Sequence, residues 1–137
     1  MADTASGPAR LLPLASDRKC ILIVDDNSAV RTIVREGLEM RGGYVCAEAV
    51  NGLEAIKKAK QVTPDLIILD LAMPELNGFE VATVLRREMP NIPVVILTMY
   101  AEALGRSLAK RVGAKAVVAK ADGMSGLVEC VRGLLDS

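Results

Sequence analysis

The sequence contains no histidine and no tryptophan, and its aromatic residues make up only 2% of the chain. Without histidine, neither a histidine-based metal site nor a histidine general base can form. With so few rings, the core has to be built from aliphatic side chains. These are plentiful, since hydrophobic residues make up 51% of the 137 residues, which is enough for one folded domain with a sizeable core.

An excess of charge is also missing. Lys plus Arg and Asp plus Glu both number 17, so the formal net charge is zero, which argues against a dedicated nucleic-acid surface. The cysteines form no CxxC pair, which disfavours a zinc site or a redox motif. We expect Cys20, Cys46 and Cys130 to be buried reduced thiols of a cytoplasmic protein. No apolar run approaches the roughly 20 residues that span a bilayer, and no signal peptide is visible.

The pattern beyond the N-terminus predicts one domain. Residues 1–18 are rich in Ala, Ser, Pro and Asp, which is typical of a mobile tail, and the domain is expected over residues 19–137. Short apolar runs bounded by turn residues predict strands buried on both faces. The expected strands cover residues 20–24, 44–50, 66–69, 94–97 and 116–119.

Apolar residues at helical spacing predict a helix after each strand. The first of these helices is expected to start at Asn27 or Ser28 and to end at Gly42-Gly43. Its predicted apolar stripe consists of Val30, Ile33, Val34, Gly37 and Leu38. Asn51, with Glu54 three residues later, is typical of a helix cap. Apolar strands alternating with amphipathic helices favour an α/β fold, a doubly wound parallel sheet in a three-layer sandwich.

Polar residues stand where four of these strands end. They are Asp25 and Asp26, Asp70, Thr98 and Lys120. The carboxyl ends of parallel strands share one edge of the sheet, so these side chains can converge there. Clustered carboxylates repel one another, and they either raise a pKa or bind a cation. Oxygen ligands without histidine or cysteine favour Mg²⁺ or Mn²⁺.

The same set of residues suits phosphoryl transfer. A lysine across the site places a positive charge near a phosphate, and a threonine hydroxyl can donate to a phosphate oxygen. The central carboxylate, Asp70, is then free to act as the nucleophile toward phosphorus. We therefore predict phosphoryl transfer onto Asp70, with charge stabilised by the metal and Lys120.

At these positions the sequence resembles the receiver domain of two-component response regulators, the CheY-like family with a flavodoxin-like fold. The resemblance covers residues 19 to about 135. The matching residues are Asp25-Asp26, Asp70 within Asp-Leu-Ala-Met-Pro-Glu-Leu-Asn-Gly, Thr98, and Lys120 after Gly113-Ala114. The resemblance implies a five-stranded parallel sheet in the order 2-1-3-4-5. It also implies a module that is switched by phosphorylation and is not an enzyme acting on other substrates.

The resemblance further implies how the ion is held. Asp26 and Asp70 would ligate Mg²⁺ directly, Ala72 would add its backbone carbonyl, and Asp25 would act largely through water.

It also implies how the phosphoryl group is received. Asp70 would accept it from a histidine kinase, a phosphotransfer domain or a small phosphodonor. Lys120 would pair with the aspartate and then with the phosphoryl group, while Thr98 would move to hydrogen-bond it. The local change of charge would then bias a two-state surface.

Some positions depart from the family pattern. Val117 stands where an aromatic switch residue is usual, so the usual coupling from threonine to that ring is missing or is taken over by another group, and Tyr100 is the only ring near Thr98. Met99 stands where a small residue is common. Ala121 follows Lys120, where many receivers have a proline.

Partners would dock near the first helix and the loop after Lys120. The output surface is expected on the fourth helix, fifth strand and fifth helix, where Arg106, Lys110 and Arg111 are exposed candidates. Homodimerisation through this face is one hypothesis. No direct binding to nucleic acid or membrane is expected.

Other readings stay open. The chain could be a receiver cut from a longer DNA-binding regulator, or a receiver-like interaction module not controlled by phosphorylation. A phosphatase of the haloacid-dehalogenase type would need an Asp-x-Asp pair, and Asp25-Asp26-Asn27 does not provide it. A flavodoxin would need a Ser/Thr/Gly-rich loop after the first strand, where this chain has acids, and acids repel phosphate unless a cation intervenes.

Overall fold

The computed structural model describes residues 18–71, 78–99 and 106–136. Within them one parallel sheet runs in the order β2-β1-β3-β4-β5, which confirms the expected fold. Its strands are β1 (Cys20–Val24), β2 (Val45–Ala49), β3 (Leu66–Asp70), β4 (Val94–Thr98) and β5 (Ala116–Ala119). The predicted strand limits are right to within one residue at each end.

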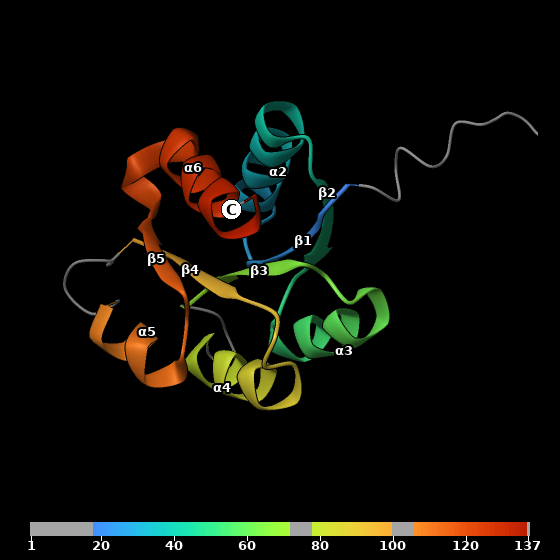
Figure 1. Ribbon diagram of the computed structural model, residues 1–137, viewed down its shortest axis with the longest axis vertical. Helices are drawn as coiled ribbons and strands as arrows, with labels where there is room; N and C mark the ends of the chain where they lie inside the picture. Colours follow the sequence, from blue (N-terminus) through green and yellow to red (C-terminus); the bar gives the residue numbers. More distant parts are fainter. Residues whose placement is uncertain (1–17, 72–77, 100–105, 137) are drawn as a thin grey trace, which may run out of the picture.

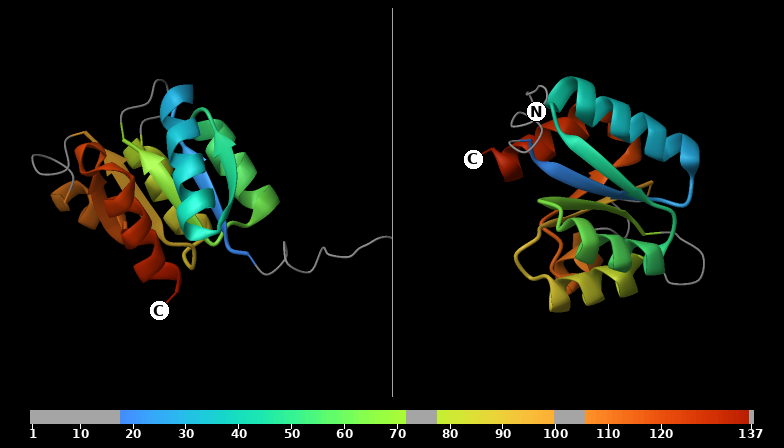
Figure 2. Two further views of the ribbon diagram at one scale, coloured as in Figure 1. Left: turned by 90° about the horizontal axis from the view of Figure 1, so that it is seen from above. Right: turned by 90° about the vertical axis from the view of Figure 1, so that its right-hand side faces the viewer.

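Helices cover both faces of this sheet, so the molecule has three layers (Figure 1). They are α2 (Ser28–Gly37), α3 (Gly52–Val62), α4 (Gly78–Glu88), α5 (Arg106–Val112) and α6 (Gly123–Leu135). A π-helical turn, η1 (Leu38–Gly42), extends α2, and a 3₁₀ turn, η3 (Lys120–Asp122), precedes α6. Helices α2 and α6 lie on one face, and α3, α4 and α5 lie on the other, as Figure 1 and the right-hand view of Figure 2 show.

The core is aliphatic and divided by the sheet, as the composition predicted. Every residue of β3 and β4 is buried. On the α2 and α6 side the helices contribute Val34, Leu38, Leu127, Val128 and Val131. On the other side they contribute Ala55, Ala59, Val81, Ala82 and Leu85. Burial on both faces explains why the strands read as continuous apolar runs.

Helix α2 begins and ends largely as predicted. The Asn27 side chain accepts hydrogen bonds from the backbone N–H groups of Ala29 and Val30, at 2.9 and 3.1 Å. Gly43 ends η1 with φ of 72°, a left-handed conformation that favours glycine. The predicted apolar stripe of this helix was wrong at Ile33, whose side chain is 58% exposed. Ile33 lies at the edge of the cavity between α2 and α6 and not over the sheet.

Helix α3 has the predicted cap. The Asn51 side chain accepts from the Glu54 N–H at 2.9 Å, and the Glu54 carboxylate accepts from the Val50 N–H at 2.9 Å. Two backbone donors that the helix itself cannot pair are thereby satisfied.

All three cysteines are free thiols. Only Cys46 is fully buried, so the prediction was wrong for Cys20 and Cys130, which are half-buried. Burial raises the pKa of Cys46 to about 12. Among the described residues, no helix combines the length and the apolar character that crossing a bilayer requires.

Candidate functional site

The strand register places the predicted site residues along one edge of the sheet. Asp70 is the last residue of β3 and pairs with Leu97 of β4, while Thr98 ends β4 and pairs with Ala119 of β5. Asp25 directly follows β1, the strand between β2 and β3. The sheet thus delivers side chains from separate parts of the chain to one place, as expected at the carboxyl ends of parallel strands.

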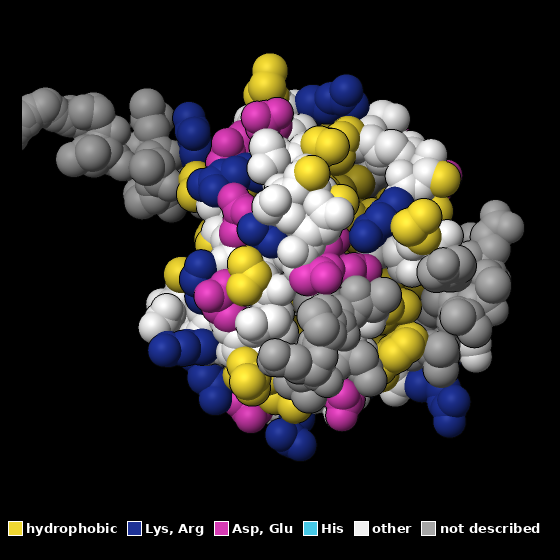
Figure 3. Space-filling view, turned by 180° about the vertical axis from the view of Figure 1, so that it is seen from behind, with side chains coloured by type: hydrophobic (Ala, Val, Ile, Leu, Met, Phe, Trp, Pro, Cys, Tyr) yellow, Lys and Arg dark blue, Asp and Glu magenta, His cyan; other side chains and the backbone are white. Residues whose placement is uncertain are grey.

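Three acidic side chains meet at this edge. One carboxylate oxygen each of Asp25, Asp26 and Asp70 lies within 4.8 Å of the others. Asp25 and Asp70 are 2% and 6% exposed, whereas Asp26 is open to solvent. The face opposite to that of Figure 1 shows acidic side chains gathered near its middle (Figure 3). We call these three residues the acidic cluster.

The acidic cluster is paired with one ammonium group among the described residues. The Lys120 Nζ lies 3.2 Å from Asp25 Oδ2 and 3.6 Å from Asp70 Oδ1. Its side chain is 23% exposed, so it reaches the acids from the rim. A single positive charge leaves the cluster with an excess of negative charge, which favours a cation.

The donor set also fits a divalent cation chemically. It consists of hard carboxylate oxygens, which Mg²⁺ prefers. The Oδ2 atom of Asp25 is buried, and in the described part of the chain no hydrogen bond reaches it with good geometry, although Lys120 is at ion-pair distance. A buried carboxylate oxygen in this state can accept a further positive partner.

Asp25 is fixed through its backbone and through its other carboxylate oxygen. Its N–H donates to the Ala49 carbonyl at 3.2 Å, and Asn27 N–H donates to Asp25 Oδ1 at 2.9 Å. Arg31 Nη1 donates to the Asp25 carbonyl at 2.7 Å. Sequence reasoning missed Arg31, because a basic residue on a helix carries no sign of its target, although its place six residues after Asp25 puts it on the turn facing the strand end.

Gly78 packs against the backbone that follows Asp70. Its N–H donates to the Leu71 carbonyl at 3.0 Å. A Cβ added at this glycine would lie 2.4 Å from the Asp70 carbonyl oxygen and 2.5 Å from Leu71 Cα. Only a residue without a side chain allows this approach, so glycine at position 78 lets α4 pack directly against the end of β3.

The remaining predicted residues have mixed outcomes. Thr98 is buried at the site edge, and Met99 beside it is 71% exposed. Val117 is half-buried and packs against the cluster under α3, α4 and α5. Ala72, predicted to offer its carbonyl, and Tyr100 lie outside the described residues. The peptide bonds of the described residues, including that after Lys120, are all trans.

A largely apolar cavity of about 200 Å³ lies beside the acidic cluster, between α2 and α6. Lys120 stands in its wall, together with Leu97 from the sheet. The helices line the rest with Val30, Ile33, Val34, Gly123, Met124 and Leu127. The exposed Ile33 therefore belongs to the mouth of a cavity that opens beside the proposed chemistry.

Comparison with protein families gives a match over residues 21–132 to the response regulator receiver domain. Among curated proteins, the chain is 41% identical over 96 residues to the alkaline phosphatase synthesis transcriptional regulatory protein PhoP of Bacillus subtilis. That match covers 70% of this chain and 40% of PhoP. The chain is 31% identical to the chemotaxis protein CheY of Thermotoga maritima, covering 82% of this chain and 94% of CheY.

Among solved structures, the response regulator TrrA of Thermotoga maritima is similar, with a TM-score of 0.77 and 35% identity over 85% of this chain and 99% of that one. TrrA was crystallised in complex with Mg²⁺-BeF. The chain spans 40% of PhoP and about half of several other matched regulators, so the activities of those whole proteins do not follow for it.

Proposed function

Because the chain belongs to the response regulator receiver family of two-component systems, we propose that Asp70 is its phosphoryl acceptor and that the reaction depends on Mg²⁺. The observation that supports this most directly is the convergence of Asp25, Asp26, Asp70 and Lys120 at one strand edge. The matched family is a receiver family and not a phosphatase family, which counts against the enzyme alternative.

Asp70 supplies the nucleophile. One of its carboxylate oxygens bonds to phosphorus while the bond from phosphorus to the donor's nitrogen or oxygen breaks, and the leaving group takes up a proton. The strand holds Asp70 in place, since it is the last paired residue of β3 and is only 6% exposed. This fixed position aligns the attacking oxygen with a donor that approaches from solvent.

Lys120 and Thr98 bind the transferred group. The ammonium group already lies 3.6 Å from Asp70 Oδ1, so it can pair with a phosphoryl oxygen on that residue. Thr98 ends the adjacent strand and can donate its hydroxyl after a small movement. These charge-assisted contacts stabilise the aspartyl phosphate and report its presence to β4 and β5.

Mg²⁺ would be held by Asp26 and Asp70, with Asp25 at its side and the Ala72 carbonyl as the further ligand implied by the family. When bound, it would offset the charge of the phosphoryl oxygens. The acidic cluster has the ligand chemistry for this ion, and the similar protein TrrA binds Mg²⁺-BeF. Mn²⁺ would suit the same oxygens.

The phosphodonor would be a histidine kinase or a phosphotransfer protein. It would dock over the apolar cavity between α2 and α6, whose wall contains Lys120 and whose rim contains Ile33. An exposed apolar rim beside charged chemistry suits a protein partner, because the partner excludes water from the reacting groups. Residues 19–137 would form the receiver, and residues 1–18 would be a tail.

Output would occur on the face formed by α5, β5 and α6, which are the predicted fourth helix, fifth strand and fifth helix; Lys110 and Arg111 of α5 are exposed. Homodimerisation through this face and the absence of direct binding to nucleic acid remain predictions.

The test is the intact mass of the protein after incubation with Mg²⁺ and acetyl phosphate or phosphoramidate. We expect one phosphoryl adduct on the wild type and none on Asp70→Ala. Asp136→Asn is the matched control, because Asp136 is exposed and far along the chain at the end of α6, and it should be labelled like the wild type. EDTA should abolish the adduct.

Folded wild-type protein that takes no phosphoryl group from any donor would refute the proposed acceptor role. It would favour an interaction module that is not controlled by phosphorylation. Labelling that persists in Asp70→Ala would move the acceptor to another residue.

A further inference from the structure

Asp25 is held by contacts of two kinds. Its N–H, paired with Ala49, and its Oδ1, which accepts from Asn27 N–H, use backbone partners that no side-chain substitution removes. Its carbonyl, by contrast, accepts from a side chain, the Arg31 guanidinium, at 2.7 Å. The orientation of this carbonyl therefore depends on one replaceable residue of α2.

That carbonyl sets the position of the next acid. The Asp25 carbonyl and the Asp26 N–H belong to one rigid peptide plane, so a hydrogen bond that fixes the carbonyl also fixes the direction in which Asp26 leaves it. Asp26 is exposed, so packing contributes little to its orientation. The Arg31 hydrogen bond is thus placed to keep Asp26 within the 4.8 Å spacing of the acidic cluster.

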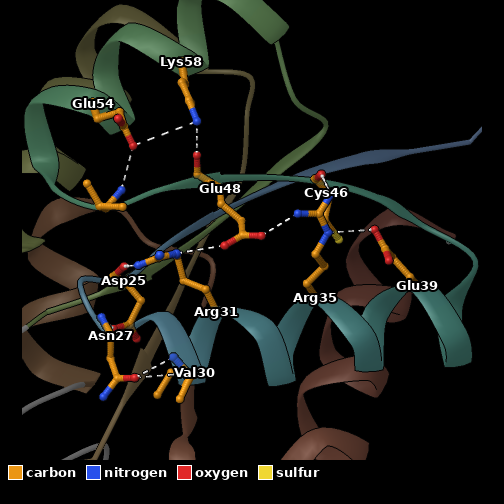
Figure 4. Close-up of polar contacts among 12 residues, drawn as sticks. Asp25, Asn27, Val30, Arg31, Arg35, Glu39, Cys46, Glu48, Glu54 and Lys58 are labelled. Atoms are coloured by element: carbon orange, nitrogen blue, oxygen red, sulfur yellow. Dashed lines mark hydrogen bonds and ion pairs between the residues drawn. The ribbon is translucent and has the colours of Figure 1, made fainter.

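Arg31 is itself held by Glu48 of β2. Arg31 Nε donates to Glu48 Oε1 at 2.8 Å, and the Arg31 side chain is only 13% exposed. Figure 4 shows the guanidinium lying between the Asp25 carbonyl and the Glu48 carboxylate. Arg35, one turn further along α2, also binds Glu48, but its other contacts are to the Glu39 carboxylate and the Cys46 carbonyl.

Glu48 remains charged at neutral pH. Its burial alone would raise the pKa of its carboxyl, but hydrogen bonds from Arg31 and Arg35 outweigh burial and lower the pKa below its usual value. A charged acceptor holds the Arg31 guanidinium in one orientation.

We propose that Arg31 is a positioning residue for the cation site: its guanidinium, held by Glu48, fixes the Asp25–Asp26 peptide and thereby brings the acidic cluster to the spacing that Mg²⁺ requires. This inference rests on the proposed function. It assigns a role to a residue that touches neither the ion nor the phosphoryl group.

Charge and geometry predict opposite results when Arg31 is replaced by glutamine. Removal of a positive charge near the acidic cluster lowers the repulsion on the ion, so charge alone predicts tighter Mg²⁺ binding. Loss of the peptide anchor predicts weaker binding, since groups that orient metal ligands are typically worth about 10-fold to 100-fold in affinity. The direction of the change therefore identifies the mechanism.

The experiment measures the Mg²⁺ dissociation constant by isothermal titration calorimetry, and the Tm, for the wild type, Arg31→Gln and Arg35→Gln. Arg35→Gln is the matched control, because it removes the same charge and a bond to the same carboxylate but leaves the Asp25 carbonyl paired. We expect about 10-fold weaker binding for Arg31→Gln and a change under about twofold for Arg35→Gln. Both variants should lose some thermal stability.

Arg31→Lys provides a second test of the same contact in case the glutamine variant does not fold. It keeps the positive charge, but one ammonium group cannot reproduce the fork that joins the carbonyl to Glu48, so binding should still weaken by several fold. Equal Mg²⁺ affinity of the wild type and both Arg31 variants, or tighter binding by Arg31→Gln, would overturn the positioning role while leaving the proposed function intact. A wild type that binds no Mg²⁺ would overturn both.

Discussion

Replacing Gly78 by alanine tests how closely α4 is packed against the site. An alanine Cβ would lie 2.4 Å from the Asp70 carbonyl oxygen and 2.5 Å from Leu71 Cα. Both are backbone atoms of the chain leaving β3, so no side-chain rotation can relieve the contact. Either α4 or the end of β3 must move.

Two effects compete in this variant. Alanine is the better helix former, and its advantage over glycine inside a helix is about 0.5–1 kcal/mol. Overpacking a dense site costs typically about 1–3 kcal/mol. Gly78 is the first residue of α4, where helix propensity counts least, so we expect the clash to dominate. The expected net loss is about 1–2 kcal/mol of unfolding free energy, a decrease in Tm of roughly 3–8 °C.

Gly133→Ala in α6 is the matched control. A Cβ at Gly133 meets nothing within 4 Å, so this variant should gain up to about 1 kcal/mol. Urea denaturation gives the free energies, and intact mass after reaction with acetyl phosphate gives the rate of labelling. We expect labelling to slow in Gly78→Ala only. A Gly78→Ala protein that is as stable as the wild type and is labelled at the wild-type rate would refute the packing argument.

Two further predictions concern titratable groups. Because the pKa of Glu48 is lowered in the folded protein, its contribution to stability is complete above the unfolded pKa and is lost as the pH falls through the folded pKa. In urea titrations the free energy of unfolding should therefore differ more between wild type and Glu48→Gln at pH 7 than at pH 3. An equal difference at the two pH values would contradict this prediction. Burial raises the pKa of Cys46 to about 12, so at pH 8 iodoacetamide should modify Cys46 in the native protein far more slowly than it modifies Cys130. Peptide mass mapping measures both rates. Equal rates would contradict the prediction and would mean that Cys46 becomes exposed.

The sheet was predictable largely because its central strands, β1, β3 and β4, are buried on both faces. Runs such as Leu66–Leu69 contain no polar residue until the chain reaches the strand end, so the sequence marks both the strand and its functional terminus. The caps at Asn27 and Asn51 were predictable for a similar reason, since a short polar side chain there pairs locally with backbone N–H groups.

Features that depend on distant partners were not predictable. Ile33 has the spacing of a core residue, but the gap between α2 and α6 leaves it at a rim, and nothing in the spacing reports that gap. The bond from Arg31 to the Asp25 carbonyl likewise needs the strand and the helix in three dimensions. The π-helical turn at η1 was also not predicted, because only its first residue, Leu38, is buried, and its sequence therefore has no apolar spacing that would distinguish a π-turn from an α-helix.

The contacts around Glu48 have a consequence for self-association. Strand β2 is an outer strand of the sheet, and such strands present unpaired backbone groups to which a strand from another molecule can add. The Val45 N–H and the Ala49 carbonyl point toward β1. In a parallel strand the backbone groups of successive residues point to alternate sides, so the carbonyls of Cys46 and Glu48 point away from the sheet. Arg35 of α2 donates a hydrogen bond to the Cys46 carbonyl, and Lys58 of α3 donates one to the Glu48 carbonyl. A strand from another molecule would have to displace both cations before it could pair with β2, so these two side chains keep neighbouring molecules from extending the sheet.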